Sequence, residues 1–98
     1  MAQTIALREL RPYRELFYEG ISRKESHGCD TLFRECSMRF GSCSVDDFIR
    51  QAYMYLSVKK NNLAMVSAQA SGNPNYSRNL ANIEIILSNF ERRFPEYR

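Results

Sequence analysis

One stretch of the chain, from Val45 to about Ala70, constrains the fold more than any other. It contains no glycine or proline, and apolar residues recur along it at the three- and four-residue steps of one helix face. Before it, Ser44 supplies an N-cap, and Asp46 and Asp47 face the positive end of the expected helix. The pattern predicts a long helix. Its apolar positions are Val45, Phe48, Ile49, Ala52, Tyr53 and Leu56, continued by Leu63, Val66 and Ala70.

The main open point in this stretch is whether the helix continues past Asn62. Two adjacent asparagines are poor helix formers, but neither proline nor glycine follows them before Gly72. We therefore expect one helix that reaches about Ala70. The alternative is a break at Asn61, after which residues 63–70 would fold back as a separate helix.

The N-terminal part of the chain carries the pattern of a shorter helix. Proline is tolerated in the first turn of a helix and disrupts its interior, so this helix is expected to begin near Arg11 or Pro12. Gly20 marks its expected end. The polar residues 22–29 that follow are expected to form a loop.

A second short helix is expected over residues 31–40, with Asp30 as its N-cap and Gly41 as its stop. Its apolar stripe and that of the long helix predict a shared core. The residues expected in this core are Phe33, Phe40, Phe48, Ile49, Ala52 and Leu56.

The C-terminal part of the chain predicts a last amphipathic helix. The glycine and proline at residues 72–75 indicate a turn, and apolar residues from Leu80 to Phe94 then follow at helical spacing before Pro95. No stretch alternates for long enough to demand a strand. The 98 residues are enough for one domain, 1–98, and we expect an all-α fold, a small antiparallel helical bundle of about four helices.

Charge and hydropathy narrow the choice of partner and compartment. The 14 Lys and Arg against 11 Asp and Glu leave a net charge of +3, far below the balance of polybasic nucleic-acid binders. The first residues lack the basic and apolar regions of a signal peptide, and no apolar run is long enough to span a membrane. Three cysteines suit reduced thiols better than a disulfide framework. We therefore expect a cytoplasmic protein without a membrane segment.

Four side chains have the chemistry of zinc ligands: His27, Cys29, Cys36 and Cys43. Their spacing is unlike that of a zinc site, because successive cysteines are seven residues apart, which is ~10 Å along a helix. Thiolates that share a zinc ion lie within ~4 Å of each other. We therefore expect Cys36 to be a core thiol and the protein to need no metal or other cofactor.

Catalytic constellations are also weak in this sequence. The pair of His27 and Cys29 lacks a third group to orient the imidazole, and Asp46 and Asp47 are explained by their place at a helix N-terminus. There is no glycine-rich phosphate loop. The protein is therefore not expected to be an enzyme.

The segment from Gly41 to Leu56 resembles the turn and second helix of ribbon-helix-helix DNA-binding proteins. The resemblance rests on the glycine and serines before the helix, on Ile49-Arg50-Gln51-Ala52, and on the tyrosines that precede Leu56. It covers about a sixth of the chain. That family reads DNA with a strand before its first helix, whereas residues 22–29 show no strand-like alternation.

The function that these features favour is binding to another protein. We expect a non-enzymatic protein-binding domain that acts as a small regulator, adaptor or inhibitor by occupying a partner's surface, with a homodimer formed through the long helix. The alternative is a dimeric regulator that binds double-stranded DNA. Exposed tyrosines, arginines and the end of the long helix suit an interface. The expected contact residues are Arg14, Tyr18, Tyr55, Lys59, Leu63, Met65 and Val66.

Overall fold

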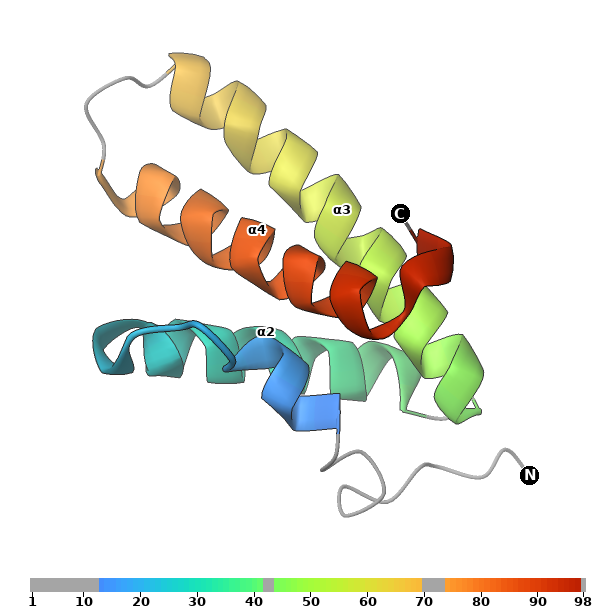
Figure 1. Ribbon diagram of the computed structural model, residues 1–98. Coiled ribbons are helices and arrows are strands. Elements are labelled where there is room, and N and C mark those ends of the chain that lie inside the picture. The colour runs from blue at the N-terminus through green and yellow to red at the C-terminus, as the bar shows by residue number, and fades with distance from the viewer. Residues whose placement is uncertain (1–12, 42–43, 70–73, 98) are drawn as a thin grey trace.

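The computed structural model describes residues 13–41, 44–69 and 74–97, and these residues form helices and turns without a strand. Three α-helices and three short 3-10 helices follow one another along this part of the chain (Figure 1). In chain order they are η1 (Glu15–Phe17), η2 (Arg23–Glu25), α2 (Ser26–Phe40), α3 (Val45–Gln69), α4 (Pro74–Arg93) and η3 (Pro95–Tyr97).

The long helix predicted from the sequence is confirmed as α3. It runs from Val45 to Gln69 without a break at Asn61, so no separate helix folds back from Leu63. The predicted N-cap is also present: the Asp47 backbone N–H donates to the Ser44 hydroxyl oxygen at 3.2 Å. This bond satisfies one of the N–H groups that a helix start leaves without a partner.

The start predicted for α2 is wrong. The helix begins at Ser26, directly after η2, so most of residues 22–29 are helical instead of forming a loop. Asp30 lies inside α2, where its carboxylate pairs with Arg34 one turn later at 3.1 Å and no longer serves as a cap. The predicted end of this helix is confirmed, because α2 stops at Phe40, immediately before Gly41.

The chain before α2 is less regular than the sequence predicts. The predicted start near Arg11 or Pro12 lies outside the described residues; in the described part, residues 13–14 are α-helical and lead into the 3-10 turn η1, so the helix that the sequence predicts up to Gly20 ends early. Gly20 then adopts a positive φ of 77°, which reverses the chain toward η2. Beyond α3, helix α4 starts at Pro74, within the predicted turn. Proline suits the first position of a helix because the N–H that it lacks would have no intrahelical partner there.

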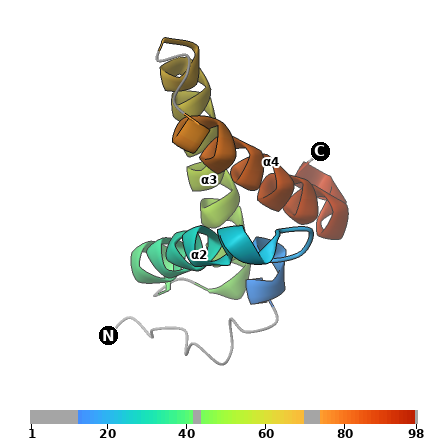
Figure 2. The ribbon, with the colours of Figure 1, turned by 90° about the vertical axis from the view of Figure 1, so that its left-hand side faces the viewer.

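Helices α3 and α4 lie side by side and run in opposite directions, with α2 crossing them near the N-terminal half of α3 (Figures 1 and 2). The C-terminal half of α3 extends past α2 with α4 beside it. The molecule is therefore elongated, with principal extents of 46 × 26 × 25 Å.

The apolar core lies where α2, α3, α4 and η1 meet. Phe17 sits at its centre, and its ring makes edge-to-face contacts with Phe33 at 5.3 Å and with Phe90 at 5.7 Å between centroids. Five of the six core residues predicted from the sequence are buried in this cluster, whereas Phe40 is half-buried at its edge against Tyr55. The buried apolar residues are Leu16, Phe17, Cys29, Leu32, Phe33, Cys36, Phe48, Ile49, Ala52, Leu56, Ile83, Ile86, Leu87 and Phe90.

The buried polar side chain of Asn89 in α4 forms hydrogen bonds with the backbone in and after η1. Its amide nitrogen donates to the backbone oxygens of Leu16 at 2.9 Å and Glu19 at 2.8 Å. Leu16 is the middle residue of η1, and Glu19 lies two residues after the end of η1, in the turn that follows. Asn89 therefore holds the irregular N-terminal turn against α4.

Candidate protein-binding surface

Two of the predicted contact residues, Arg14 and Tyr18, lie together beside Asp30 of α2. The Tyr18 hydroxyl donates to Asp30 Oδ1 at 2.5 Å, and the Arg14 guanidinium lies 3.2 Å from both oxygens. The hydrogen bond from Tyr18 and the nearby charges of Arg34 and Arg14 hold the pKa of Asp30 below its ordinary value, although burial opposes this. Burial and the bond to Asp30 raise the pKa of Tyr18. The cluster therefore joins η1 to α2, with the Tyr18 hydroxyl and Oδ1 of Asp30 both used in bonds within the chain.

Two more predicted residues, Tyr55 and Lys59, meet Glu35 between α3 and α2. The Tyr55 hydroxyl donates to Glu35 Oε2 at 2.7 Å, and the Lys59 ammonium lies 3.4 Å from the same oxygen. Burial would raise the pKa of Glu35, but Tyr55, Lys59 and Arg39 outweigh it and keep that pKa below its ordinary value. The guanidinium of Arg39 also lies over the Tyr55 ring, 4.9 Å from its centroid. These contacts of Tyr55 and Lys59 with Glu35 and Arg39 join α3 to α2.

The last three predicted residues lie on the C-terminal half of α3 and differ in exposure. Leu63, expected from the sequence as a contact residue, is half-buried and packs against the core. Met65 and Val66, the other two contact residues expected at the end of the long helix, are exposed. Leu63 therefore faces the core, whereas Met65, two residues later in α3, is exposed to solvent.

A strip of exposed apolar residues follows the solvent side of α3, opposite its buried face. We call Met54, Val58, Asn61 and Met65 the outer strip; its three apolar members are 55%, 59% and 63% exposed. Successive members are four, three and four residues apart, so the strip keeps to one side of the helix for three turns, about 16 Å. Met54 and Val58 are not among the contact residues expected from the sequence. The helical spacing of Ala52 and Leu56 indicates the core face of α3, and Met54 and Val58 lie on the other side.

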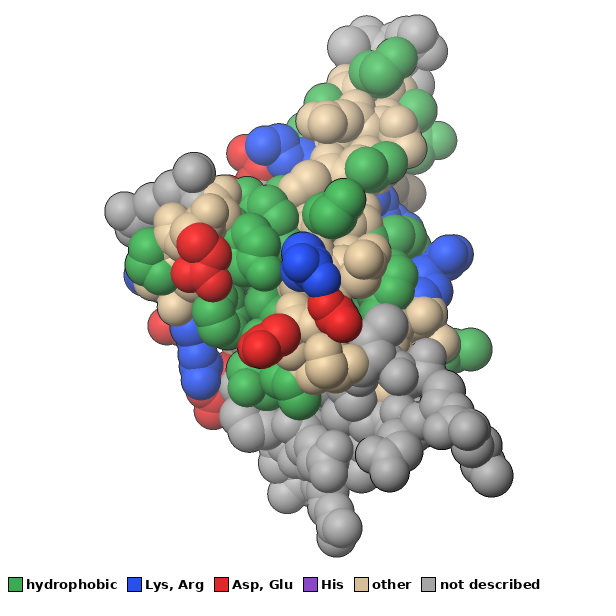
Figure 3. All heavy atoms as spheres, turned by 90° about the vertical axis from the view of Figure 1, so that its right-hand side faces the viewer, with side chains coloured by type: hydrophobic (Ala, Val, Ile, Leu, Met, Phe, Trp, Pro, Cys, Tyr) green, Lys and Arg blue, Asp and Glu red, His purple; other side chains and the backbone are tan. Residues whose placement is uncertain are grey.

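The outer strip is free of charged side chains along its length. A charged pair, Asp47 and Arg50, lies toward the N-terminal end of α3, and the two side chains form an ion pair with each other. From there toward the C-terminal end of α3, separate hydrophobic side chains alternate with uncharged polar side chains and backbone on this side of the molecule (Figure 3). The neighbours of the strip, Ala64 and Asn62, are exposed and uncharged.

The thiols that the sequence analysis weighed as zinc ligands point into the core. Cys29 and Cys36 are free and fully buried on α2, whereas His27 is exposed, and Cys43 lies outside the described residues. Burial raises the pKa of Cys36 to about 12 and also raises that of Cys29. Within the described ranges, no group of three His, Cys, Asp or Glu side chains is arranged to hold a metal ion.

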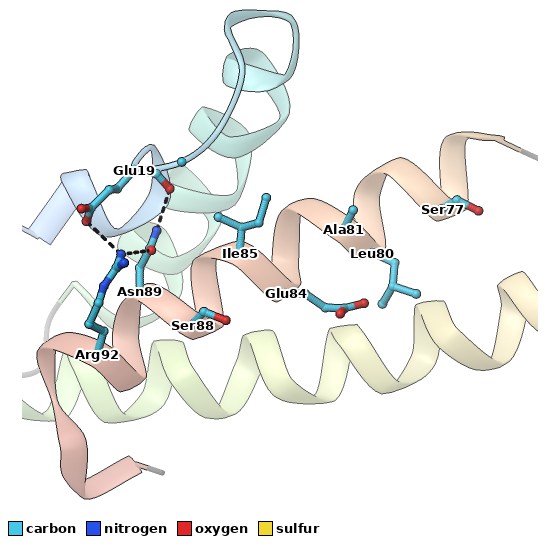
Figure 4. Close-up of a pocket in the computed structure, with 10 residues that line it drawn as sticks. Glu19, Ser77, Leu80, Ala81, Glu84, Ile85, Ser88, Asn89 and Arg92 are labelled. Carbon is cyan, nitrogen blue, oxygen red and sulfur yellow. Dashed lines mark hydrogen bonds and ion pairs between the residues drawn. The ribbon is translucent and has the colours of Figure 1, made fainter.

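A shallow groove of about 750 Å³ runs along α4 (Figure 4). Leu80, Ala81 and Ile85 line its middle. At one end, Arg92 Nη2 lies 3.4 Å from Glu19 Oε2. A smaller cavity of about 240 Å³ lies where α2, α3 and α4 meet.

In the described part of the chain, no helix is long and apolar enough to cross a membrane.

Comparisons with known proteins add no information on function. The chain matches no protein-family model, no curated protein and no solved structure.

Proposed function

We propose that this protein is a non-enzymatic protein-binding domain and that its outer strip on α3 binds a second copy of the same chain. The observation that carries the proposal is the exposure of Met54, Val58 and Met65 on one side of a helix whose other side is already buried. Contiguous exposed apolar residues on a small domain mark a contact surface.

The spacing of the outer strip supports a helix as its partner. Steps of four, three and four residues are the a/d spacing of a coiled-coil seam, in which side chains of one helix fit between those of another. Asn61 occupies one seam position. A polar residue in such a seam lowers stability and specifies register and the number of chains, which suits a defined pair of helices.

The absence of charge along the strip supports a second copy as that partner. A two-fold axis places the same patch on both sides of an interface, so a patch with charges of a single sign would repel its copy, whereas an uncharged patch does not. Between Arg50 and Met65 the outer strip presents only apolar and amide side chains. Two copies can therefore approach along α3 without like-charge repulsion.

The alternative function, a dimer that binds double-stranded DNA, needs a face of cations available to phosphates. Within the described ranges, several arginines are instead paired with carboxylates of the same chain. These arginines are Arg14, Arg34, Arg50, Arg78 and Arg92. We therefore favour protein binding, and salt-dependent retention on double-stranded DNA would favour the alternative.

The proposal also includes the finer features expected from the sequence. The antiparallel pair of α3 and α4 supports a small antiparallel bundle, in which a helix starting near Pro12 would be the fourth. Two buried free thiols, Cys29 and Cys36, suit a reducing compartment such as the cytoplasm. We further propose that the domain acts as a small regulator, adaptor or inhibitor, because an exposed helix face can occupy the surface of a partner.

A charge placed in the outer strip tests the proposal. Val58→Glu would place a carboxylate within the apolar contact on each chain, where it loses water without gaining a partner, so we expect the dimer to dissociate at least ~10-fold more readily. The matched control is Ser77→Glu, which adds the same charge to an exposed residue of α4, away from the strip. Light scattering on a sizing column measures the mass of both variants. Equal masses for the two variants and the unaltered chain at every concentration would contradict the proposal.

A further inference from the structure

Two of the three apolar side chains of the outer strip are methionines. Met54 is 55% and Met65 is 63% exposed, and the two lie 11 residues apart, about 16 Å along α3. Another described methionine, Met38 of α2, is 87% exposed and lies outside the strip. A thioether that solvent reaches is oxidised by peroxides to the sulfoxide. All three side chains are therefore open to oxidation, and two of them belong to the outer strip.

The described thiols do not compete for the same oxidant. Peroxide reacts with cysteine when the thiol is ionised and solvent reaches it. Cys29 and Cys36 are fully buried, and burial raises the pKa of Cys36 to about 12, so neither presents a thiolate to solvent at neutral pH. In the described part of the chain, the sulfur atoms exposed to a soluble oxidant are therefore those of methionine.

Oxidation changes the property on which association through the outer strip depends. It converts an apolar, flexible side chain into a polar one whose S=O oxygen accepts hydrogen bonds from water. Burying that oxygen in an apolar contact removes its water, which is unfavourable unless a donor replaces it. A sulfoxide at Met54 or Met65 would therefore oppose the burial of the strip.

The symmetry of a pair of identical chains places methionine against methionine. The steps of four, three and four residues read the same in both directions along the strip. An antiparallel second copy centred on the strip therefore sets Met54 against Met65 of that copy, and a parallel one sets each methionine against its counterpart. In either arrangement, a sulfoxide on one chain would face an apolar thioether of the other.

We propose that Met54 and Met65 are sites of reversible oxidation whose sulfoxides dissociate the pair of chains formed through the outer strip, a role that rests on the self-association proposed above. The oxidant is a peroxide. The sulfur lone pair attacks one peroxide oxygen, the S–O bond forms as the O–O bond breaks, and the second oxygen leaves as water after proton transfer. Sulfur loses the two electrons that the peroxide gains. A thiol-dependent sulfoxide reductase reverses the change, releasing the oxygen as water and leaving the thiols as a disulfide.

Oxidation and association exclude each other on the same atoms. Association covers Met54 and Met65, so peroxide acts on the separate chain, in which both are exposed. By mass action, a higher protein concentration leaves a smaller fraction of separate chains. Concentration should therefore slow the oxidation of Met54 and Met65 and leave that of Met38 unchanged.

The test treats the full chain with hydrogen peroxide and follows two quantities. Peptide mass spectrometry measures the sulfoxide at each methionine, and sedimentation equilibrium measures the molecular mass of the same samples. We expect the dissociation constant of the pair to rise at least ~10-fold when both strip methionines are oxidised, and a sulfoxide reductase with dithiothreitol to restore it. Oxidation of Met54 and Met65 should be at least ~3-fold faster at about 5 μM than at about 200 μM protein, with equal rates for Met38.

Leucine variants separate the strip methionines from Met38. The double variant Met54→Leu, Met65→Leu keeps the strip apolar and cannot be oxidised there, so it should associate with or without peroxide. The matched control Met38→Leu should still dissociate on oxidation. Because Cys43 lies outside the described residues, every sample also carries Cys43→Ser, which removes that thiol as a target.

The outcomes distinguish this proposal from the one on which it rests. Untreated protein with the mass of one chain at every concentration would contradict both. If the untreated protein associates, three results would overturn the oxidation sites alone: association that survives full oxidation of Met54 and Met65, oxidation rates of these residues that do not depend on concentration, or peroxide-induced dissociation of the double leucine variant. Circular dichroism of the oxidised samples completes the test, since dissociation accompanied by loss of helix would reflect unfolding and would also overturn the proposal.

Discussion

Phe48 of α3 is buried where α3 meets the rest of the core, and the sequence pattern already predicts it there. Phe48→Ala should lower the free energy of unfolding by ~3 to 5 kcal/mol, because it removes a buried ring and leaves a cavity. A domain of this size has ~5 to 10 kcal/mol in total, so the variant should be close to unfolding. Urea denaturation measures the change, with Met38→Ala as the control, because the Met38 side chain of α2 is exposed and lies outside the outer strip. An unchanged midpoint for Phe48→Ala would remove this residue from the core.

Asp30 makes the free energy of unfolding depend on pH in the acid range. Its pKa lies below the ordinary value of about 3.9 because Tyr18 hydrogen-bonds to its charged form. A group whose pKa is lowered on folding stabilises the protein above its unfolded pKa, and this stabilisation is lost as the pH falls through the folded pKa. Asp30→Asn should therefore be less stable than the unaltered protein at pH 7, and the difference should narrow at acid pH, as the pH falls through the lowered pKa of Asp30 in the folded protein.

Urea midpoints at pH 7 and at acid pH measure this difference. The control is Glu84→Gln, an exposed carboxylate of α4 that has no ion pair with a described residue. If the deficit of Asp30→Asn were the same at both pH values, the charge of Asp30 would not be its cause.

At the scale of the elements, Asn89 holds η1 against α4 through two backbone carbonyls. Asn89→Ala would leave both carbonyls without this donor and should destabilise the protein by about 2 kcal/mol. Because the lost bonds are local, hydrogen exchange should accelerate most in residues 15–21. Uniform acceleration across α2, α3 and α4 would show that Asn89 supports the whole core instead of this turn.

The helices are predictable from the sequence wherever local signals agree with tertiary contacts. At the start of α3, the Ser44 cap and the apolar spacing indicate the same boundary, and the helix begins there. At the start of α2, the local signal and the tertiary contacts disagree. Asp30 has the chemistry of an N-cap, but Tyr18 and Arg14, distant in sequence, use its carboxylate in the middle of the helix. No local pattern indicates such a contact.

The candidate surface was only partly predictable for a related reason. Met65 and Val66 follow from the length of the helix, and both are exposed. Met54 and Val58 become distinguishable only after the buried face of α3 is known, because both faces of this helix carry apolar residues. The cavity where α2, α3 and α4 meet was missed altogether, since its lining comes from three helices that are far apart in sequence.

For the whole molecule, the long helix α3 serves two surfaces. One face packs against α2 and α4 and forms the core, and the other carries the outer strip. Association along the outer strip would cover the apolar residues that a single chain leaves in water, and it would place two α3 helices at the centre of a larger helical assembly.

Sedimentation equilibrium of the unaltered protein at about 50 μM tests this central claim most directly. An interface with a dissociation constant of ~1 to 10 μM predicts a weight-average mass well above that of one chain, 11.5 kDa, approaching twice that value as concentration rises. A mass of one chain throughout the concentration range would contradict the account.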